Sequence, residues 1–224
     1  MARHGGGLSR LERVLWIGVL AGLLMLPGAI PADHRLMPAV SAWRWAPLLD
    51  VTQRATWLGY GAVDIGLVLL FAVFGWWGGD AGLRTRGLVG ALTVAGAGIL
   101  DQVVKNVACR ARPSASQAGI FFAHFPCFPA SYAYASFPSG HATTAFATAV
   151  ILSLWYPRGA GLFVGLALVA GLSRVVLGAH FPSDVLAGAV LGSGVALTVH
   201  ALVGAIRNPK GARAASADAR LPGC

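Results

Sequence analysis

Six long apolar stretches determine what this chain can fold into. They lie near residues 14–30, 56–77, 87–104, 141–156, 160–176 and 185–206. A bilayer needs about 20 mostly apolar residues for each spanning helix, and a composition of 56% hydrophobic and 11% charged residues is far from that of a soluble domain. The sequence therefore predicts an all-α polytopic membrane protein. We expect a six-helix transmembrane bundle over residues 1–207 and a disordered cytoplasmic tail over 208–224.

Basic residues predict how the bundle is oriented. Cytoplasmic loops keep an excess of Lys and Arg. Outside the motifs described below, ten basic residues fall on the side of both termini and four on the other side. We therefore expect cytoplasmic termini in a bacterial-type inner (plasma) membrane, with the loop 105–141 outside. Whether the first helix is cleaved as a signal peptide stays open, and either outcome leaves the later loops on the same side.

The net charge of +9 has two interpretations. It fits basic loops that touch anionic lipid. Nucleic-acid binding would call for a basic stripe interleaved with aromatic residues, and the sequence has none. We expect membrane lipids as partners, with no nucleic acid and no obligate protein partner.

Three short clusters of ionisable residues lie at the edges of the apolar stretches. The clusters are Lys105 with Arg112-Pro113, then Pro138-Ser139-Gly140-His141, then Ser173-Arg174 followed by His180 and Asp184. Ionisable groups at membrane depth are costly and are therefore usually functional. Fixed cations, two imidazoles and an orienting carboxylate are also what phosphoryl transfer without a metal requires.

Written as Lys-x6-Arg-Pro, Pro-Ser-Gly-His and Ser-Arg-x5-His-x3-Asp, this pattern resembles the signature of the type-2 phosphatidic acid phosphatase family, which are integral membrane lipid phosphatases. The resemblance covers residues 100–190, and no motif position departs from it. It implies an active site at the outer membrane face that hydrolyses a lipid phosphomonoester or diphosphate. It also implies a phosphohistidine intermediate and no metal or other cofactor.

The cationic residues form the predicted phosphate-binding part of the site. Lys105 and Arg112 are seven residues apart, so on a continuing helix they would project from one face. Ser139 and Gly140 open a predicted helix whose unpaired N–H groups attract an anion. Gly140 lets the backbone approach the phosphate, and the Ser139 hydroxyl can cap the helix or donate to the ligand. Arg174 supplies the third cation.

Two histidines and an aspartate form the predicted catalytic part. Pro182 suits the first turn of a helix, which places Asp184 just inside that helix and His180 just before it. A carboxylate so close can accept a hydrogen bond from one imidazole nitrogen and leave the other free to attack phosphorus, so His180 is the predicted nucleophile. The family resemblance assigns His141 as the general acid. Ser173 either binds a phosphate oxygen or packs.

Several other polar residues are candidates of lower rank. We expect Arg110 to be a surface or headgroup charge, because its spacing turns it away from the face of Lys105. Asp64 and Asp101 lie in apolar stretches and could pair with the site cations or with each other. His124 is expected to be a solvated loop residue.

Cysteines and small residues give two further expectations. Cys109 and Cys127 both fall in the predicted outer loop, where they form either a disulfide or two unpaired thiols. Small residues at four-residue spacing would let the fifth and sixth helices approach closely. The pairs are Gly161 with Gly165 and Gly188 with Gly192.

Two classes of function remain. The first is a phosphatase acting on undecaprenyl diphosphate, lipid A, phosphatidylglycerophosphate or phosphatidate. The second is a non-enzymatic lipid-binding or transport protein on a phosphatase scaffold. The second class predicts loss of His141, His180 or Asp184, and all three are present.

Overall fold

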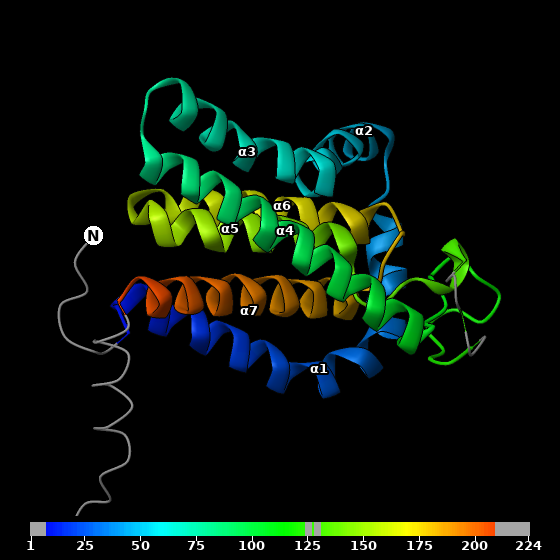
Figure 1. Cartoon of the computed structure of the whole chain (residues 1–224). Helices are drawn as coiled ribbons and strands as arrows, with labels where there is room; N and C mark the ends of the chain where they lie inside the picture. The colour runs from blue at the N-terminus through cyan, green and yellow to red at the C-terminus, as the bar shows by residue number, and fades with distance from the viewer. Residues whose placement is uncertain (1–7, 124–126, 128–130, 209–224) are drawn as a thin grey trace, which may run out of the picture.

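The computed structural model describes residues 8–123, 127 and 131–208, and within them the secondary structure is entirely helical, as predicted. Its α-helices are α1 (Arg10–Ala42), α2 (Ala46–Ala55), α3 (Gly61–Trp77), α4 (Ala81–Ala108), α5 (Gly140–Trp155), α6 (Ala160–Val176) and α7 (Pro182–Arg207). Short 3₁₀ helices are η1 (Thr56–Gly59), η2 (Tyr132–Tyr134) and η3 (Pro157–Gly159). Figure 1 shows that α1 begins and α7 ends at the same end of the molecule. Residues 209–224 of the predicted tail and His124 lie outside the described residues.

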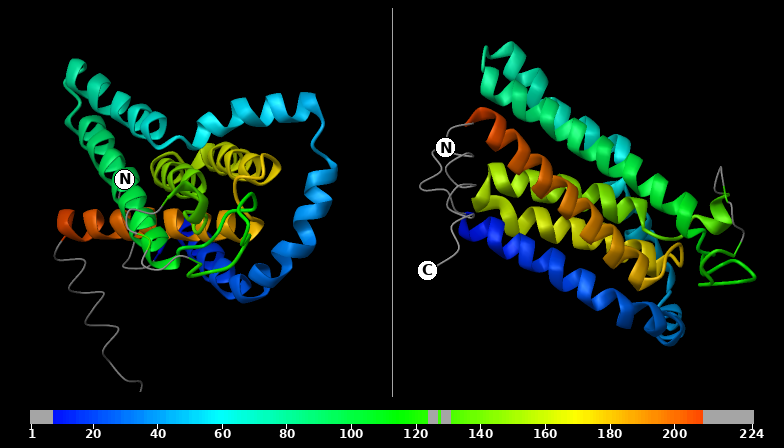
Figure 2. Two further views of the ribbon diagram at one scale, coloured as in Figure 1. Left: turned by 90° about the vertical axis from the view of Figure 1, so that its right-hand side faces the viewer. Right: turned by 60° about the horizontal axis from the view of Figure 1, so that its bottom comes forward.

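Helix α5 is the centre of the bundle. It packs against α4, α6 and α7, while α3 lies on α4 and α1 lies on α7. Figure 2 shows this arrangement from two further sides. Val150 and Ile151 of α5 form the main hydrophobic core with Leu197 of α7 and Val19 of α1. The helix that begins with the second motif is therefore surrounded by the helices that carry the other two.

Glycines bring α7 close to α5. A Cβ at Gly188 would lie 2.5 Å from the carbonyl oxygen of Ser139, and one at Gly192 would collide with the carbonyl oxygen of Thr143. The prediction that these glycines join the fifth and sixth helices is wrong, because the close contact is with the fourth predicted helix, α5. A Cβ at Gly161 of α6 would meet no described atom within 4 Å. The close approach of α7 sets Asp184 beside Ser139, whose N–H donates to the Asp184 carbonyl at 2.9 Å.

The chain is an integral membrane protein by the length and apolarity of its helices. Within the described residues, α1, α4, α7 and the segment Pro157–Val176 are long and apolar enough to span a bilayer. A fifth candidate is the pair Ala46–Gly59 and Gly61–Trp77, bent by 51° at the break. Helix α5 has 16 residues, fewer than the roughly 20 needed to cross a bilayer core. The predicted count of six spans is therefore not confirmed.

The N-terminal helices differ from the prediction. Helix α1 continues to Ala42 although Pro27, Pro31 and Pro38 lie inside it, and Figure 1 shows it bent. Prolines in a helix kink it and remove backbone hydrogen bonds, which is why the sequence suggested an end near residue 30. The extra turns carry Asp33 into the interior. Helix α2, which the apolar pattern did not predict, packs on α6.

Candidate active site

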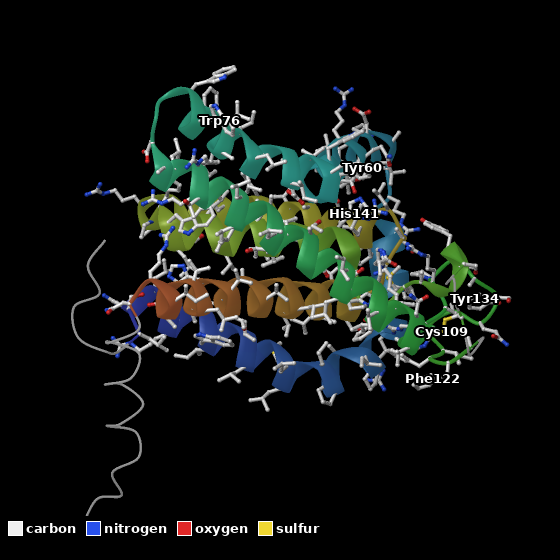
Figure 3. All side chains as sticks on the ribbon, in the orientation of Figure 1. Tyr60, Trp76, Cys109, Phe122, Tyr134 and His141 are labelled. Atoms are coloured by element: carbon white, nitrogen blue, oxygen red, sulfur yellow. A yellow bond between two sulfur atoms is a disulfide. The ribbon has the colours of Figure 1, made fainter. Side chains whose placement is uncertain are left out.

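The three motif clusters converge at one end of the bundle. Figure 3 shows His141 toward the end of the molecule that lies opposite Trp76. Four charged or titratable side chains lie close enough to act electrostatically on the His141 ring: Lys105, Arg112, Arg174 and His180. The structure thus brings together residues that the sequence separates by up to 75 positions.

Lys105 lies in the last turn of α4 and is buried. Its Nζ is 2.8 Å from Asp101 Oδ2 and donates to the Pro138 carbonyl. Asp101 also accepts from Thr143 Oγ1 at 3.0 Å, and its partner Lys105 is a site cation, one of the pairings that the sequence left open. A Cβ at Gly140 would lie 3.2 Å from Asp101 Oδ2. The missing side chain of Gly140 therefore leaves room for this ion pair under the start of α5.

Arg112 lies in the segment after α4, not on the helix. The helix ends at Ala108, and Cys109 takes a left-handed conformation with φ of 45°. The prediction that Lys105 and Arg112 share one helix face is therefore wrong. Backbone carbonyls hold the Arg112 guanidinium instead: Nε donates to Tyr132 at 2.7 Å, Nη1 to Ala179 at 2.8 Å and Nη2 to Ala135 at 3.2 Å.

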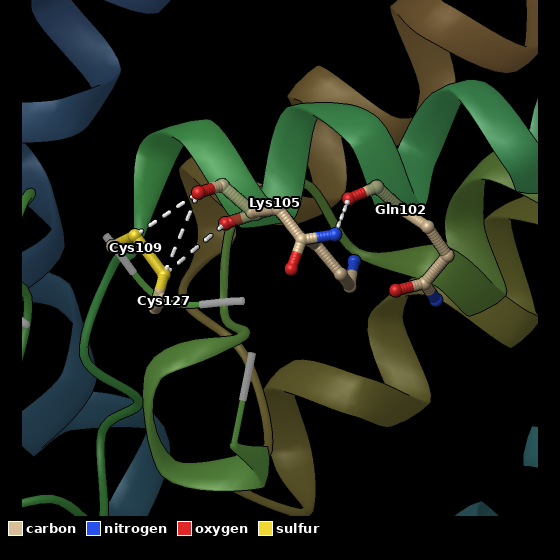
Figure 4. The surroundings of a disulfide bond; sticks show 5 residues. Gln102, Lys105, Cys109 and Cys127 are labelled. Atoms are coloured by element: carbon tan, nitrogen blue, oxygen red, sulfur yellow. Dashed lines mark hydrogen bonds between the residues drawn. A yellow bond between two sulfur atoms is a disulfide. The ribbon is translucent and has the colours of Figure 1, made fainter. Parts of the chain in front are cut away.

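A disulfide closes the segment that follows α4. Cys109 and Cys127 are bonded, with their Cα atoms 5.9 Å apart, which decides between the two alternatives left open by the sequence. Figure 4 shows the bond beside the last turns of α4, close to Lys105. The bond therefore anchors a segment with motif residues on both sides of Cys109.

The two ring nitrogens of His180 have different partners. Nδ1 lies 2.8 Å from the carbonyl oxygen of Ser136, to which it must donate, because a carbonyl only accepts. Nε2 then carries the lone pair and faces Arg112 Nη1 at 3.3 Å. Asp184 Oδ2 is 3.6 Å from Nδ1, an ion-pair distance that exceeds a good hydrogen bond. Burial, together with the charge of Arg112, lowers the pKa of His180 to about 4 against the opposing effect of Asp184.

Asp184 is held mainly by other groups. Ser136 Oγ donates to its Oδ2 at 2.6 Å, and the Phe181 N–H donates to the same oxygen at 2.8 Å. Arg110 Nη1 contacts its Oδ1 at 2.5 Å. His180 and Asp184 are therefore joined through Ser136, whose carbonyl orients the ring and whose hydroxyl binds the carboxylate.

Arg110 is buried, so the prediction of a surface charge is wrong. Its side chain is 1% exposed and lies between two carboxylates, with Nη2 2.6 Å from Asp33 Oδ2 on α1. The guanidinium also lies between two rings, 4.7 Å from the centre of Phe121 and 4.4 Å from that of Phe181. The helix-face prediction failed because α4 ends two residues before Arg110.

Sequence reasoning also missed Asp33, Ser136 and Ser183. Asp33 accepts from the Ser183 N–H at 3.0 Å and from its hydroxyl, and Ser183 Oγ accepts from Arg110 Nη1 at 2.7 Å. The available signal was Asp33 itself, an acidic residue just after an apolar stretch. The serines gave no signal, because single serines are common in any sequence.

Two predicted phosphate ligands have donor atoms without partners. Ser139 Oγ is buried and makes no hydrogen bond within the described residues, so it does not cap α5. Arg174 Nη1 donates to Thr56 Oγ1 at 2.6 Å, while its buried Nε has no partner there. Ser173 Oγ instead donates to the Ala170 carbonyl at 2.6 Å, in line with the packing alternative. Free donors suit an incoming anion.

Two further observations concern a candidate carboxylate and metal binding. Asp64 in the first turn of α3 is buried, and it belongs to no ion pair found among the described residues. Across the same residues, no three His, Cys, Asp or Glu side chains are grouped so that they could hold a metal ion.

A family model of the PAP2 superfamily matches residues 87–207. The lipid A 1-phosphatase of Rhizobium johnstonii is 40% identical over 101 residues, which are 45% of this chain and 41% of that protein. The putative undecaprenyl-diphosphatase YbjG of Escherichia coli K12 is 32% identical over 129 residues, which are 57% of this chain and 62% of that protein. The match thus spans about two fifths of the length of the Rhizobium relative.

A solved structure gives the same fold over nearly the whole molecule. The transmembrane PAP2-type phosphatidylglycerolphosphate phosphatase of Bacillus subtilis superposes with a TM-score of 0.66 at 23% identity, covering 89% of this chain and 99% of that one. The family model covers more than half of the chain and contains all three motif clusters. The chain therefore belongs to the PAP2 superfamily.

Proposed function

We propose that this protein is a lipid phosphate phosphatase. The observation that carries the proposal is the convergence of Lys105, Arg112, Arg174 and His180 around His141. Arg112 Nη1 faces His180 Nε2 at 3.3 Å, and the Ser139 hydroxyl has no partner among the described residues. Fixed positive charge and preorganised donors stabilise the charge that develops on a transferring phosphoryl group. The names of the lipid A 1-phosphatase and undecaprenyl-diphosphatase relatives support the same class of reaction.

The proposed reaction has two steps. In the first, His180 Nε2 bonds to phosphorus as the ester P–O bond breaks, and His141 gives a proton to the departing oxygen. A phosphate oxygen replaces Nε2 as the partner of Arg112. In the second, water attacks the phosphohistidine, His141 takes up the proton, and inorganic phosphate leaves. The low pKa of His180 supports its role as nucleophile, because its ring stays neutral at physiological pH.

One experiment tests both the activity and the substrate: release of phosphate from a panel of four lipid phosphates. The purified protein is offered undecaprenyl diphosphate, lipid A, phosphatidylglycerophosphate and phosphatidate in detergent micelles. We expect release from at least one of them. The alternative, a lipid-binding or transport protein on this scaffold, requires binding without release from any member, and that result would overturn the proposal.

The two histidines are separable by leaving group. A lipid phosphomonoester expels a basic alkoxide that needs a proton, whereas nitrophenyl phosphate expels a stable phenolate that needs little help. We expect His141→Ala to lose far more rate on the lipid than on the aryl ester, and His180→Ala to lose nearly all rate on both. Equal losses for His141→Ala on both substrates, with chemistry rate-limiting, would leave His141 as a phosphate ligand only.

We also propose that no metal takes part. Three fixed cations supply the charge that a metal would provide in other phosphatases. Activity should persist in EDTA, and vanadate, which adopts the five-coordinate geometry of the transition state, should inhibit. Activity lost in EDTA and restored only by a divalent ion would contradict this mechanism.

For the orientation, we propose an outward-facing site with cytoplasmic termini. The basic residues of the sequence support this, as does the disulfide, which suits an oxidising compartment. Single cysteines at the exposed positions Ile120 and Arg207, in a Cys224→Ser background, report the two sides. An impermeant thiol reagent on intact cells should label Ile120→Cys and spare Arg207→Cys, and the reverse pattern would invert the topology.

A further inference from the structure

A cavity of about 450 Å³ lies next to the candidate active site. Its walls come from the end of α1, the segment after α4 and the connection between α6 and α7. The side chains and backbone used below are His34, Ser41, Arg44, Pro113, Gly178 and Phe181. Among the described residues that line it none is acidic, so its charged wall group is a cation.

The cavity and the proposed phosphate site share two backbone segments. Pro113 follows Arg112 directly, and Phe181 follows His180 directly. Arg112 and His180 face each other, while their neighbours Pro113 and Phe181 line the cavity. The cavity and the proposed phosphate site therefore lie on neighbouring residues of the same two segments.

Arg44, like two of the predicted phosphate ligands, has a buried polar atom without a hydrogen-bond partner among the described residues. Its Nε is buried without a hydrogen-bond partner among the described residues, as are Ser139 Oγ and Arg174 Nε. Arg110, by contrast, satisfies its charge with two carboxylates, and none of the ion pairs found in the described chain includes Arg44. A half-buried guanidinium without an acceptor is suited to bind an anion.

Gly178 explains how Arg44 is held in place. Its φ is +68°, and a Cβ there would collide with the Arg44 guanidinium. The absence of a side chain lets the cation lie directly on the connection that carries His180. His34 lines the same cavity and packs its ring against Phe181 at 6.0 Å between centres, so an imidazole N–H is available beside the cation.

We propose that this cavity is a second phosphate subsite, which binds an anionic phosphate of a lipid headgroup other than the phosphate that is cleaved. The proposal rests on the proposed phosphatase function and adds a preference for lipids with a second phosphate group. That group belongs either to the substrate itself or to a neighbouring phospholipid. Both sources share the phosphate chemistry, and the experiment separates them.

The experiment compares two substrates with the same acyl chains. Dioleoyl phosphatidylglycerophosphate carries a phosphomonoester and a phosphodiester, whereas dioleoyl phosphatidate carries the monoester alone. Both are offered to the full-length protein in neutral phosphatidylcholine micelles. We expect Arg44→Gln to raise KM for phosphatidylglycerophosphate about tenfold, the loss typical of one charge-assisted hydrogen bond. KM for phosphatidate and kcat for both substrates should stay unchanged, and Arg44→Lys should restore part of the affinity.

Arg54→Gln is the matched control. Arg54 is on α2, 81% exposed, and pairs with Asp50 at 3.2 Å, so its loss should change neither KM. Repeating the series with phosphatidylglycerol in the micelles tests the second source. If a neighbouring headgroup fills the cavity, the Arg44→Gln effect appears for both substrates and only in those anionic micelles.

Two outcomes would overturn the subsite. One is an unchanged KM for both substrates in both kinds of micelle. The other is an equal fall of kcat on both, which would place Arg44 at the cleaved phosphate. No release by the parent protein from either substrate or from the wider panel would instead contradict the proposed phosphatase function.

Discussion

Arg110 and Arg112 are two residues apart and carry the same side chain, yet their surroundings are opposite. Arg110 is bound to the carboxylates of Asp33 and Asp184, so its charge is neutralised inside the protein. Arg112 is bound to three backbone carbonyls, which orient the guanidinium and carry no net charge. Its positive charge stays available and faces His180 Nε2.

The difference shows that the partners of an arginine, more than its burial, decide whether it holds the structure or binds a ligand. Carboxylate partners use up the charge, and removing either side leaves a buried ion uncompensated. Carbonyl partners fix the geometry and leave the charge for a substrate. By the same criterion, we propose Arg110 as a positioning residue for Asp184 and Arg112 as a phosphate ligand.

The largest effect expected is on stability at Arg110. Arg110→Ala leaves Asp33 and Asp184 buried without their cation, which typically costs about 3–5 kcal/mol. The free energy of unfolding is measured by titrating the protein in mixed micelles with dodecyl sulfate. The double variant with Asp33→Asn should recover part of the loss, because it removes one of the two uncompensated charges. Parent-like unfolding of Arg110→Ala would refute the positioning role.

Arg112 should show the opposite pattern. Arg112→Ala is expected to lower kcat/KM by about a hundred- to a thousandfold, the usual loss for one preorganised donor to a developing charge. Arg112→Lys should recover little, because a point charge cannot hold the three carbonyls and the phosphate together. Phosphate release gives the rate, and the same unfolding titration gives the stability. If Arg112→Ala lowers the free energy of unfolding as much as Arg110→Ala does, with a matching loss of rate, the two arginines do not differ in role.

The disulfide should act on both arginines together. It closes an 18-residue separation, for which chain entropy predicts a contribution of about 3 kcal/mol. We expect the Cys109→Ser/Cys127→Ser variant to have a free energy of unfolding that is lower by about this amount. It should also lower kcat, since Arg110 and Arg112 lie one and three residues after Cys109. Reduction of the parent should reproduce both changes and leave the double-serine variant unaffected.

A smaller effect is expected at Ser136. Ser136→Ala removes the hydroxyl that donates to Asp184 and keeps the carbonyl that accepts from His180. The loss of one buried hydrogen bond predicts a destabilisation of about 1 kcal/mol, with most of the activity retained. Asp184→Asn is the comparison, because it disturbs Arg110, Ser136 and His180 at once and should cost more in both measurements.

The smallest effect is a titration without loss of activity. Because burial and Arg112 lower the pKa of His180 to about 4, its ring should not titrate between about pH 5 and pH 8, where an ordinary histidine does. Histidine-labelled protein and His180→Gln together assign the resonance by NMR. In Arg112→Ala the titration should move up toward the ordinary value, since a neighbouring positive charge is gone. A parent resonance titrating near pH 6.5 would contradict the neutral nucleophile.

Local rules predicted helix starts well where one motif fixed one helix end. Pro182 marks the start of α7, as expected, and Gly140 the start of α5. These starts set His180, Asp184, Ser139 and the neighbouring N–H groups in place. Short-range signals such as a proline in the first turn depend only on adjacent residues.

Long-range partners could not be predicted in the same way. Asp33 is 77 residues from Arg110 and 150 from Ser183, and a single sequence contains no information on which distant groups will meet. The end of α4 was misjudged because Cys109 takes a left-handed turn that its type does not favour. Helix α1 was underestimated because its prolines are tolerated in a packed membrane helix.

The contact of Asp33 with Arg110 and Ser183 has a consequence for the order in which the protein is built. Helix α1 leaves the ribosome before Arg110 and α7, and the partners of its carboxylate are synthesised 77 and 150 residues later. An unpaired acid inside lipid is costly, so we expect Asp33 to stay near the aqueous surface until α7 is inserted. Helix α7 then brings Ser183 to Asp33, and Asp184, the carboxylate proposed to orient His180, reaches Arg110 with the same helix.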